Sequence, residues 1–142
     1  MSVIVKSKHF KIEELVSPTI VKLVHEDVLW GLLDDRLIQT IDKIKEKFSN
    51  GSMSINNYLW SGDRSQSGLR TKDSKYYSEG SQHSIGKAID CVFSQYNVNE
   101  VRNYILTNPD EFPFIGGVEL GVSWLHIDVR PRRNGKILTF TP

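Results

Sequence analysis

Two histidines and one aspartate in this 142-residue chain have the types and the spacing of a metal site. His83 and Asp90 lie seven positions apart, and Gly86 and Ala88 between them leave room for the backbone to pass close to another group. His126 follows on a segment that alternates polar and apolar residues. Two imidazoles and a carboxylate form the three-ligand set of a catalytic zinc ion, whose fourth position is left to water. Mixed nitrogen and oxygen ligands in such an open set favour zinc over other metals.

The aspartate and the second histidine both interrupt apolar patterns. Asp90 lies between Ile89 and Cys91, where an unpaired carboxylate would be costly and a neighbouring cation would remove that cost. His126 interrupts a well-patterned strand, and Asp128 two residues later belongs to the same face. A metal-bound imidazole beside a second carboxylate fits this pattern. Satisfied polar groups in a protein core fit the spacing equally well, so the residues alone leave both interpretations open.

The elements that must position these residues follow from hydrophobic periodicity and from the turn-forming residues. Helical patterns are found at residues 10–16, 18–30, 33–48 and 98–106, with a stop at 49–52 after the third. Strand patterns are found at residues 53–60, 85–93, 121–130 and 136–140, the last after a tight hairpin turn predicted at Asn134-Gly135. A long polar loop spans residues 61–81, and loops of this length are often functional. This order predicts a small single α+β domain over residues 1–142.

The overall composition is that of a soluble globular protein, with 39% hydrophobic and 25% charged residues. A formal net charge of +1 argues against general binding to nucleic acid or anionic lipid, so neither nucleic acid nor membrane is expected as a partner. We expect the cations Arg130, Arg132, Arg133 and Lys136 to be solvated. A single cysteine, a short N-terminal apolar run and no bilayer-length stretch predict synthesis in a cytosol without a signal peptide.

Two stretches resemble the signature of peptidase family M15: Ser81-x-His83-x-x-Gly86-x-Ala88-x-Asp90 and Trp124-x-His126-x-Asp128. This family comprises zinc metallopeptidases such as D-Ala-D-Ala carboxypeptidases and phage L-alanyl-D-glutamate endopeptidases. The resemblance implies that His83, Asp90 and His126 bind Zn²⁺, with Ser81 and Asp128 next to them. It also implies a fold similar to hedgehog domains, in which N-terminal helices accompany a central, mainly antiparallel sheet that carries the zinc site. The implied substrate is a stem peptide of peptidoglycan.

The same resemblance indicates residues that would act on the substrate. The family places an arginine after a Ser-Gly turn, near the substrate carboxylate or carbonyl, and both Arg64 and Arg70 follow such a turn. A guanidinium suits carboxylate binding or oxyanion stabilisation, and the apolar residue before it favours Arg70. Many family members carry an acidic general base three positions before the last histidine, but Ser123 stands there. Glu119 or Glu79 would then serve as the base.

The sequence therefore predicts a zinc-dependent peptidase that hydrolyses peptide-stem bonds of bacterial peptidoglycan. Its small size and the lack of a recognisable signal peptide suit a phage-encoded protein, either an endolysin or a virion-associated enzyme. Such a protein would be made in the host cytoplasm and act at the cell wall. The alternative is a catalytically impaired fold that serves as a virion or tail structural protein, with other phage virion proteins as partners. Ser123 at the position of the usual base motivates this alternative.

Overall fold

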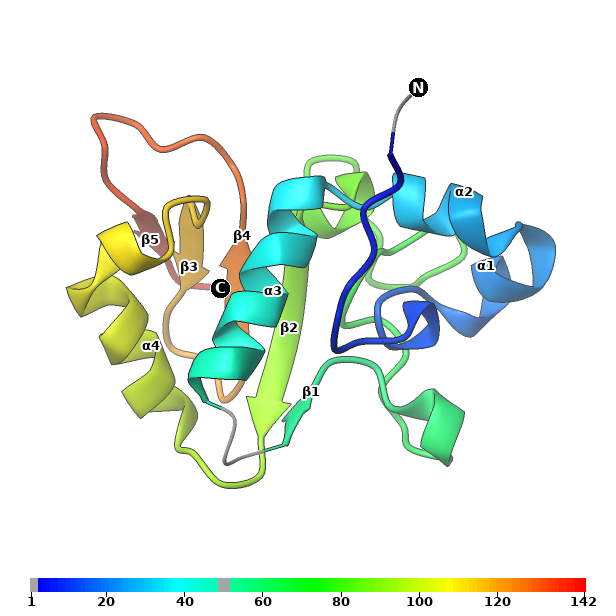
Figure 1. Ribbon diagram of the computed structural model, residues 1–142, viewed down its shortest axis with the longest axis horizontal. Helices are drawn as coiled ribbons and strands as arrows, with labels where there is room; N and C mark the ends of the chain where they lie inside the picture. The colour runs from blue at the N-terminus through cyan, green and yellow to red at the C-terminus, as the bar shows by residue number, and fades with distance from the viewer. Residues whose placement is uncertain (1–2, 49–51) are drawn as a thin grey trace.

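Within residues 3–48 and 52–142, which this computed structural model describes, five strands form a mixed sheet in the order β1-β2-β4-β3-β5 (Figure 1). The strands are β1 (Met53–Ser54), β2 (Ala88–Phe93), β3 (Gly117–Glu119), β4 (Leu125–Asp128) and β5 (Leu138–Phe140). Neighbouring strands are antiparallel except for the parallel pair β3 and β5. The predicted α+β fold with a mainly antiparallel sheet is therefore confirmed.

Four α-helices accompany the sheet in the described part of the chain: α1 (Pro18–Leu23), α2 (Glu26–Gly31), α3 (Asp35–Lys47) and α4 (Val98–Thr107). Helices α3 and α4 lie against one face of the sheet, and α1 and α2 lie to one side of it (Figure 1). Among the described residues, none of the helices is both long and apolar enough to cross a membrane.

Helix α3 confirms the helix predicted over residues 33–48. It begins after Asp34, whose carboxylate accepts a hydrogen bond of 2.9 Å from a backbone N–H of the first turn. Leu37 and Ile41 recur at helical spacing and are buried in the core. The residues expected to end this helix, 49–52, lie mostly outside the described part of the chain.

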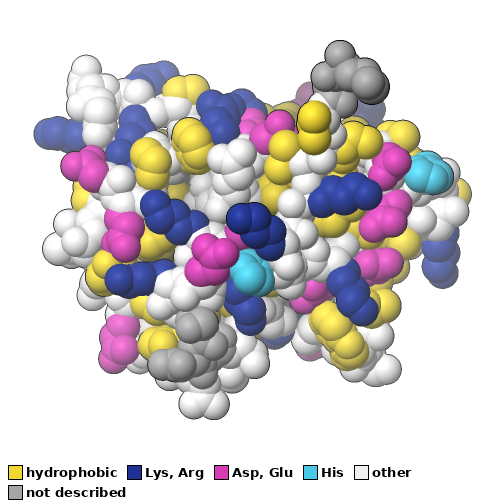
Figure 2. Space-filling view, in the orientation of Figure 1, with side chains coloured by type: hydrophobic (Ala, Val, Ile, Leu, Met, Phe, Trp, Pro, Cys, Tyr) yellow, Lys and Arg dark blue, Asp and Glu magenta, His cyan; other side chains and the backbone are white. Residues whose placement is uncertain are grey.

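The pleat of the central strands separates an apolar face from a polar face. Ile89 of β2 and Ile127 of β4 belong, with Ile41 of α3, to the main hydrophobic core. His126 and Asp128 alternate with Ile127 along β4 and therefore belong to the opposite face. On the side covered by α3 and α4, acidic and basic side chains are interspersed over the surface (Figure 2). The polar residues of β2 and β4 thus lie on the side away from these helices.

The single helix predicted over residues 18–30 is wrong, because the chain divides it into α1 and α2. Val24 is extended between the two helices, and valine is a weak helix former. His25 then caps α2, since its Nδ1 accepts a hydrogen bond of 3.1 Å from the N–H of Asp27. A local capping interaction therefore overrides the continuous apolar pattern.

Two predicted strands also differ from the structure. The strand expected over residues 53–60 ends at Ser54, and Tyr58–Trp60 form a 3₁₀ helix instead. The turn at Asn134 and Gly135 is present, with φ values of 55° and 69°. However, β5 pairs with β3 in parallel and does not return to β4, because β2 and β3 already occupy both edges of β4.

We predict that Gly86→Ala destabilises the fold by at least about 2 kcal/mol. Gly86 ends the short helix before β2 with a φ of 72°, and an added Cβ would lie 2.1 Å from the carbonyl oxygen of Leu32. The left-handed conformation alone costs a residue with a Cβ about 1–2 kcal/mol. Chemical denaturation measures the change, and Gly80→Ala is the matched control because its added Cβ has nothing within 4 Å. Equal stability of Gly86→Ala and the wild type would contradict this packing.

Candidate metal centre

Strand pairing brings three polar residues into one row across the sheet. Asp90 of β2 pairs directly with His126 of β4. On the other side of β4, the register that pairs Val118 with Ile127 places Glu119 of β3 beside His126. Residues directly opposed on antiparallel strands share a face of the sheet. Asp90, His126 and Glu119 therefore lie together on the polar face.

His83 reaches the same face from outside the sheet. It lies on a 3₁₀ helix, Gln82–Ile85, that precedes β2. Ser81 caps this helix by accepting a hydrogen bond of 3.2 Å from the N–H of His83. The His83 side chain is buried, and its Nε2 lies 3.3 Å from Oδ1 of Asp90. Ser81, which was expected next to the ligands, thus holds the backbone of one of them.

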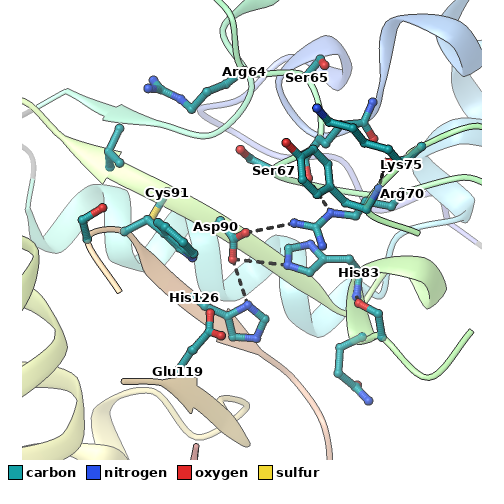
Figure 3. Close-up of a pocket in the computed structure, with 18 of the residues that line it drawn as sticks. Arg64, Ser65, Ser67, Arg70, Lys75, His83, Asp90, Cys91, Glu119 and His126 are labelled. Atoms are coloured by element: carbon teal, nitrogen blue, oxygen red, sulfur yellow. Dashed lines mark hydrogen bonds and ion pairs between the residues drawn. The ribbon is translucent and has the colours of Figure 1, made fainter. Parts of the chain in front are cut away.

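One ligand atom from each of His83, Asp90 and His126 lies within 4.8 Å of the other two. Oδ1 of Asp90 is 3.3 Å from Nε2 of His83 and 2.9 Å from Nδ1 of His126 (Figure 3). Ligand atoms around a tetrahedral zinc ion, with bonds of about 2.0–2.2 Å, lie roughly 3.3–3.5 Å apart, so small side-chain adjustments would accommodate such an ion. The three residues predicted as ligands could therefore hold a metal ion.

The remaining ring nitrogens are held by acceptors, which determines how each imidazole faces the centre. Nδ1 of His83 lies 3.0 Å from the carbonyl oxygen of Gly68, and Nε2 of His126 lies 3.0 Å from Oδ2 of Asp128. A carbonyl or carboxylate oxygen only accepts, so these nitrogens carry protons and donate. The opposite nitrogens face Asp90, and they can bind a metal ion once it takes the place of any proton shared with that carboxylate.

Each of the two carboxylates is also paired with a guanidinium. Arg70 donates from Nη2 to Oδ2 of Asp90 at 3.2 Å. Arg130 donates from Nε and Nη2 to the two oxygens of Asp128, at 2.7 and 2.6 Å. Gly117 on the neighbouring strand makes room for this pair, since an added Cβ would lie 2.5 Å from both carboxylate oxygens. The fully buried Asp128 is therefore satisfied by a bidentate arginine and by its histidine.

Burial and hydrogen bonding have opposite effects on the titration of these groups. Burial lowers the pKa of His126, but hydrogen bonds with Asp128 and Asp90 outweigh it and raise the pKa to about 9. Burial raises the pKa of the Asp90 carboxyl, yet hydrogen bonds from His126 and His83 hold it well below its ordinary value. The pKa of Asp128 is lowered against burial by His126 and Arg130. A divalent cation at this point would compete with the proton on His126.

A cavity of about 1100 Å³ adjoins the three ligands, all of which line it. Its lining also contains both candidate substrate arginines, Arg64 and Arg70, together with Glu119 and Ser123. Glu119 lies beside His126 in the cavity wall (Figure 3). Glu79 is exposed and does not belong to the lining. The structure thus brings Glu119 to the site and leaves Glu79 outside it.

The two candidate substrate arginines have different surroundings. Arg70 pairs with the aspartate ligand and also donates from Nε to the carbonyl oxygen of Gln66 at 2.8 Å. Arg64 donates to the carbonyl oxygen of Ile55 at 3.2 Å and to Oγ of Ser54 at 2.8 Å. In the close-up, Arg64 lies farther from the ligands than Arg70 does (Figure 3). Arg70 is therefore the arginine that contacts the metal-binding group.

The prediction that the cations after β4 are solvated is wrong for two of them. Arg130 pairs with the buried carboxylate of Asp128. Arg132 donates to the main-chain carbonyl oxygens of Pro109, Phe112 and Ile115. The sequence held a signal for Arg130, because a residue two positions after Asp128 in an extended segment shares its face.

Arg102 of α4 is a further arginine that sequence reasoning missed. It is 5% exposed and donates from Nη2 to the carbonyl oxygens of Val122, at 2.9 Å, and Trp124, at 2.6 Å. These carbonyl groups belong to the loop between β3 and β4, which connects Glu119 to His126. An arginine on an amphipathic helix is ordinarily solvated, so no local pattern distinguishes it.

We predict that Asp128→Asn weakens metal binding by about 10–100-fold, because the amide removes the charge that orients His126 and pairs with Arg130. Competition with a chelator of known affinity measures the change. Asp110→Asn is the matched control, since Asp110 is exposed and outside the cavity lining, and it should bind metal as the wild type does. Unchanged affinity in Asp128→Asn would show that this carboxylate does not position the histidine.

Comparisons with known proteins do not assign this chain to a family. A scan against protein-family models and searches of curated proteins and of solved structures each gave no match. The similarity to peptidase family M15 therefore stays a prediction from two short motifs, whereas the metal centre is supported by the positions of its own side chains.

Proposed function

We propose that this protein is a zinc-dependent peptidase that hydrolyses peptide-stem bonds of bacterial peptidoglycan. The observation that carries the proposal is the convergence of His83, Asp90 and His126 in the wall of a large cavity, with Glu119 on the next strand. A three-residue nitrogen and oxygen set that adjoins a cavity is typical of catalytic zinc, whereas structural zinc sites are closed by four protein ligands. The stem-peptide substrate is supported by the two motifs that resemble peptidase family M15.

Glu119 is assigned as the group that accepts a proton from the attacking water. The chemistry supplied by a bound zinc ion is polarisation of the scissile carbonyl and activation of water. Glu119 lies beside His126 across the β3–β4 pair and lines the same cavity. Its carboxylate can accept a proton at neutral pH, which the hydroxyl of Ser123 in the same lining cannot do.

Arg70 is assigned to the substrate as well as to Asp90. Its contacts with Gln66 and Asp90 use two of the five guanidinium N–H groups, which leaves other donors for a ligand. A guanidinium held beside the metal ligands suits an oxygen on which negative charge develops. Arg64, in a more distant part of the cavity wall, is assigned to another part of the substrate.

The proposed biological setting is a phage-encoded enzyme that acts on the cell wall as an endolysin or as part of the virion. The competing proposal is a catalytically impaired virion or tail component, which the serine at position 123 motivates. Glu119 in the cavity lining supplies an acid that this serine does not, and so favours the enzyme. Burial of the cavity against a neighbouring virion subunit would favour the structural role.

We predict that Glu119→Gln lowers kcat for stem-peptide cleavage by about 10²–10⁴-fold, because it removes the proton acceptor and leaves the ligands in place. Muropeptide digestion followed by chromatography measures the rate, and a chelator should abolish the wild-type activity until zinc is restored. Glu79→Gln is the matched control and should cleave at the wild-type rate, since Glu79 is exposed outside the lining.

Two results would contradict these assignments separately. Protein that carries one zinc ion per chain and yet leaves sacculi and synthetic stem peptides intact would contradict the proposed function. Full activity in Glu119→Gln, with loss in Glu79→Gln, would instead contradict only the choice of base.

A further inference from the structure

Two large aromatic side chains are exposed in the wall of the cavity. Trp124 and Tyr76 both line it and remain 38% and 54% exposed. Exposed apolar surface of this kind, rimmed by polar residues, often marks a place where a ligand binds. Metal binding, proton transfer and carbonyl binding are assigned above to other residues. The two rings are therefore available to a further part of the ligand.

The main chain of Trp124 and the ring of Tyr76 each contact charged side chains, and both aromatic side chains stay partly exposed. The main chain of Trp124 is tied to Arg102, whose Nη2 donates to the Trp124 carbonyl oxygen at 2.6 Å. The ring of Tyr76 has the guanidinium of Arg70 5.7 Å and the ammonium of Lys75 5.1 Å from its centroid. Groups held in position before a ligand arrives lose less freedom when it binds.

Neutral hydrogen-bonding groups make up much of the remaining lining. The loop that carries Tyr76 contributes hydroxyl and amide groups from Ser65, Gln66, Ser67, Ser74 and Ser81, and the 3₁₀ helix after it contributes Gln82. Hydroxyl and amide groups both donate and accept, so they match the hydroxyl and acetamido groups of a sugar.

We propose that the cavity binds a stem peptide that is still joined to its glycan, with sugar rings stacked on Trp124 and Tyr76. This inference rests on the proposed function and specifies its substrate class. A pyranose ring has an apolar C–H face and a polar edge, so aromatic faces combined with neutral polar groups match both of its surfaces. The cavity, at about 1100 Å³, is slightly larger than the range of about 300–1,000 Å³ common for small-molecule sites and has room for sugar beside peptide.

The probe for this site is a soluble tetramer of β-1,4-linked N-acetylglucosamine, which carries no peptide. We predict that it binds the zinc-loaded chain saturably in calorimetric titration. Trp124→Leu and Tyr76→Leu should each weaken this binding about tenfold, and Trp124→Phe, which keeps an aromatic face, should retain most of it. Trp60→Leu is the matched control and should bind as the wild type does, because Trp60 is 59% exposed but outside the lining.

The binding assay does not require cleavage, so its outcome is independent of peptidase activity. No saturable binding, or unchanged binding in either Trp124→Leu or Tyr76→Leu, would overturn the sugar site even if free stem peptides were cleaved. If both variants weaken binding and Trp60→Leu preserves it, the sugar site is supported even when no peptide is cleaved. The absence of cleavage would then contradict only the proposed peptidase activity. Thermal melting of each variant verifies that the exposed substitutions leave the fold intact.

Discussion

A carboxylate inside an apolar strand is the constraint on which the rest of the site depends. Asp90 lies between the buried Ile89 and Cys91, and both of its oxygens need partners there. Oδ1 meets two imidazole nitrogens and Oδ2 meets Arg70. The backbone is held as well, since the N–H of Asp90 donates to the carbonyl oxygen of Ser67 at 2.7 Å. A carboxylate flanked by two imidazoles in this way could hold a divalent cation, because the cation would satisfy all three groups together.

The sheet carries the hydrophobic core on one face and the candidate metal site on the other. Ile127 joins the hydrophobic core, while its neighbour His126 lies in the row of polar residues that includes Glu119. Strand pairing places His126 and Glu119 side by side, so the hydrogen-bond ladder of the backbone sets the distance between them. His83 lies on a short 3₁₀ helix that ends at Gly86, where the chain packs against the backbone of Leu32. Core packing and site geometry are therefore coupled through the same few strands.

The candidate ligands Asp90 and His126 could be predicted because a histidine or aspartate inside an apolar strand is anomalous in its immediate neighbourhood, whereas His83 was predicted from its spacing to Asp90 and from the motif. Arg130 was detectable in principle from its two-residue spacing to Asp128, but it was interpreted as solvated. The break before α2 depends on a cap at His25, which the continuous helical pattern hides. The pairing of β5 with β3 depends on which strand edges are free. Arg102 donates hydrogen bonds to a loop that is 20 to 22 residues away in the sequence. Such non-local choices leave no periodic signal in the chain.

We infer that His83, Asp90 and His126 together bind one divalent ion. Elemental analysis of zinc-loaded protein after gel filtration tests it most directly, with His83→Ala and His126→Ala compared with His9→Ala, whose histidine lies on the surface beside Glu46. We expect one zinc ion per chain in the wild type and in His9→Ala, and its loss from the other two variants while they remain folded. Zinc retained in His83→Ala or His126→Ala, or a folded wild type that binds none, would contradict it.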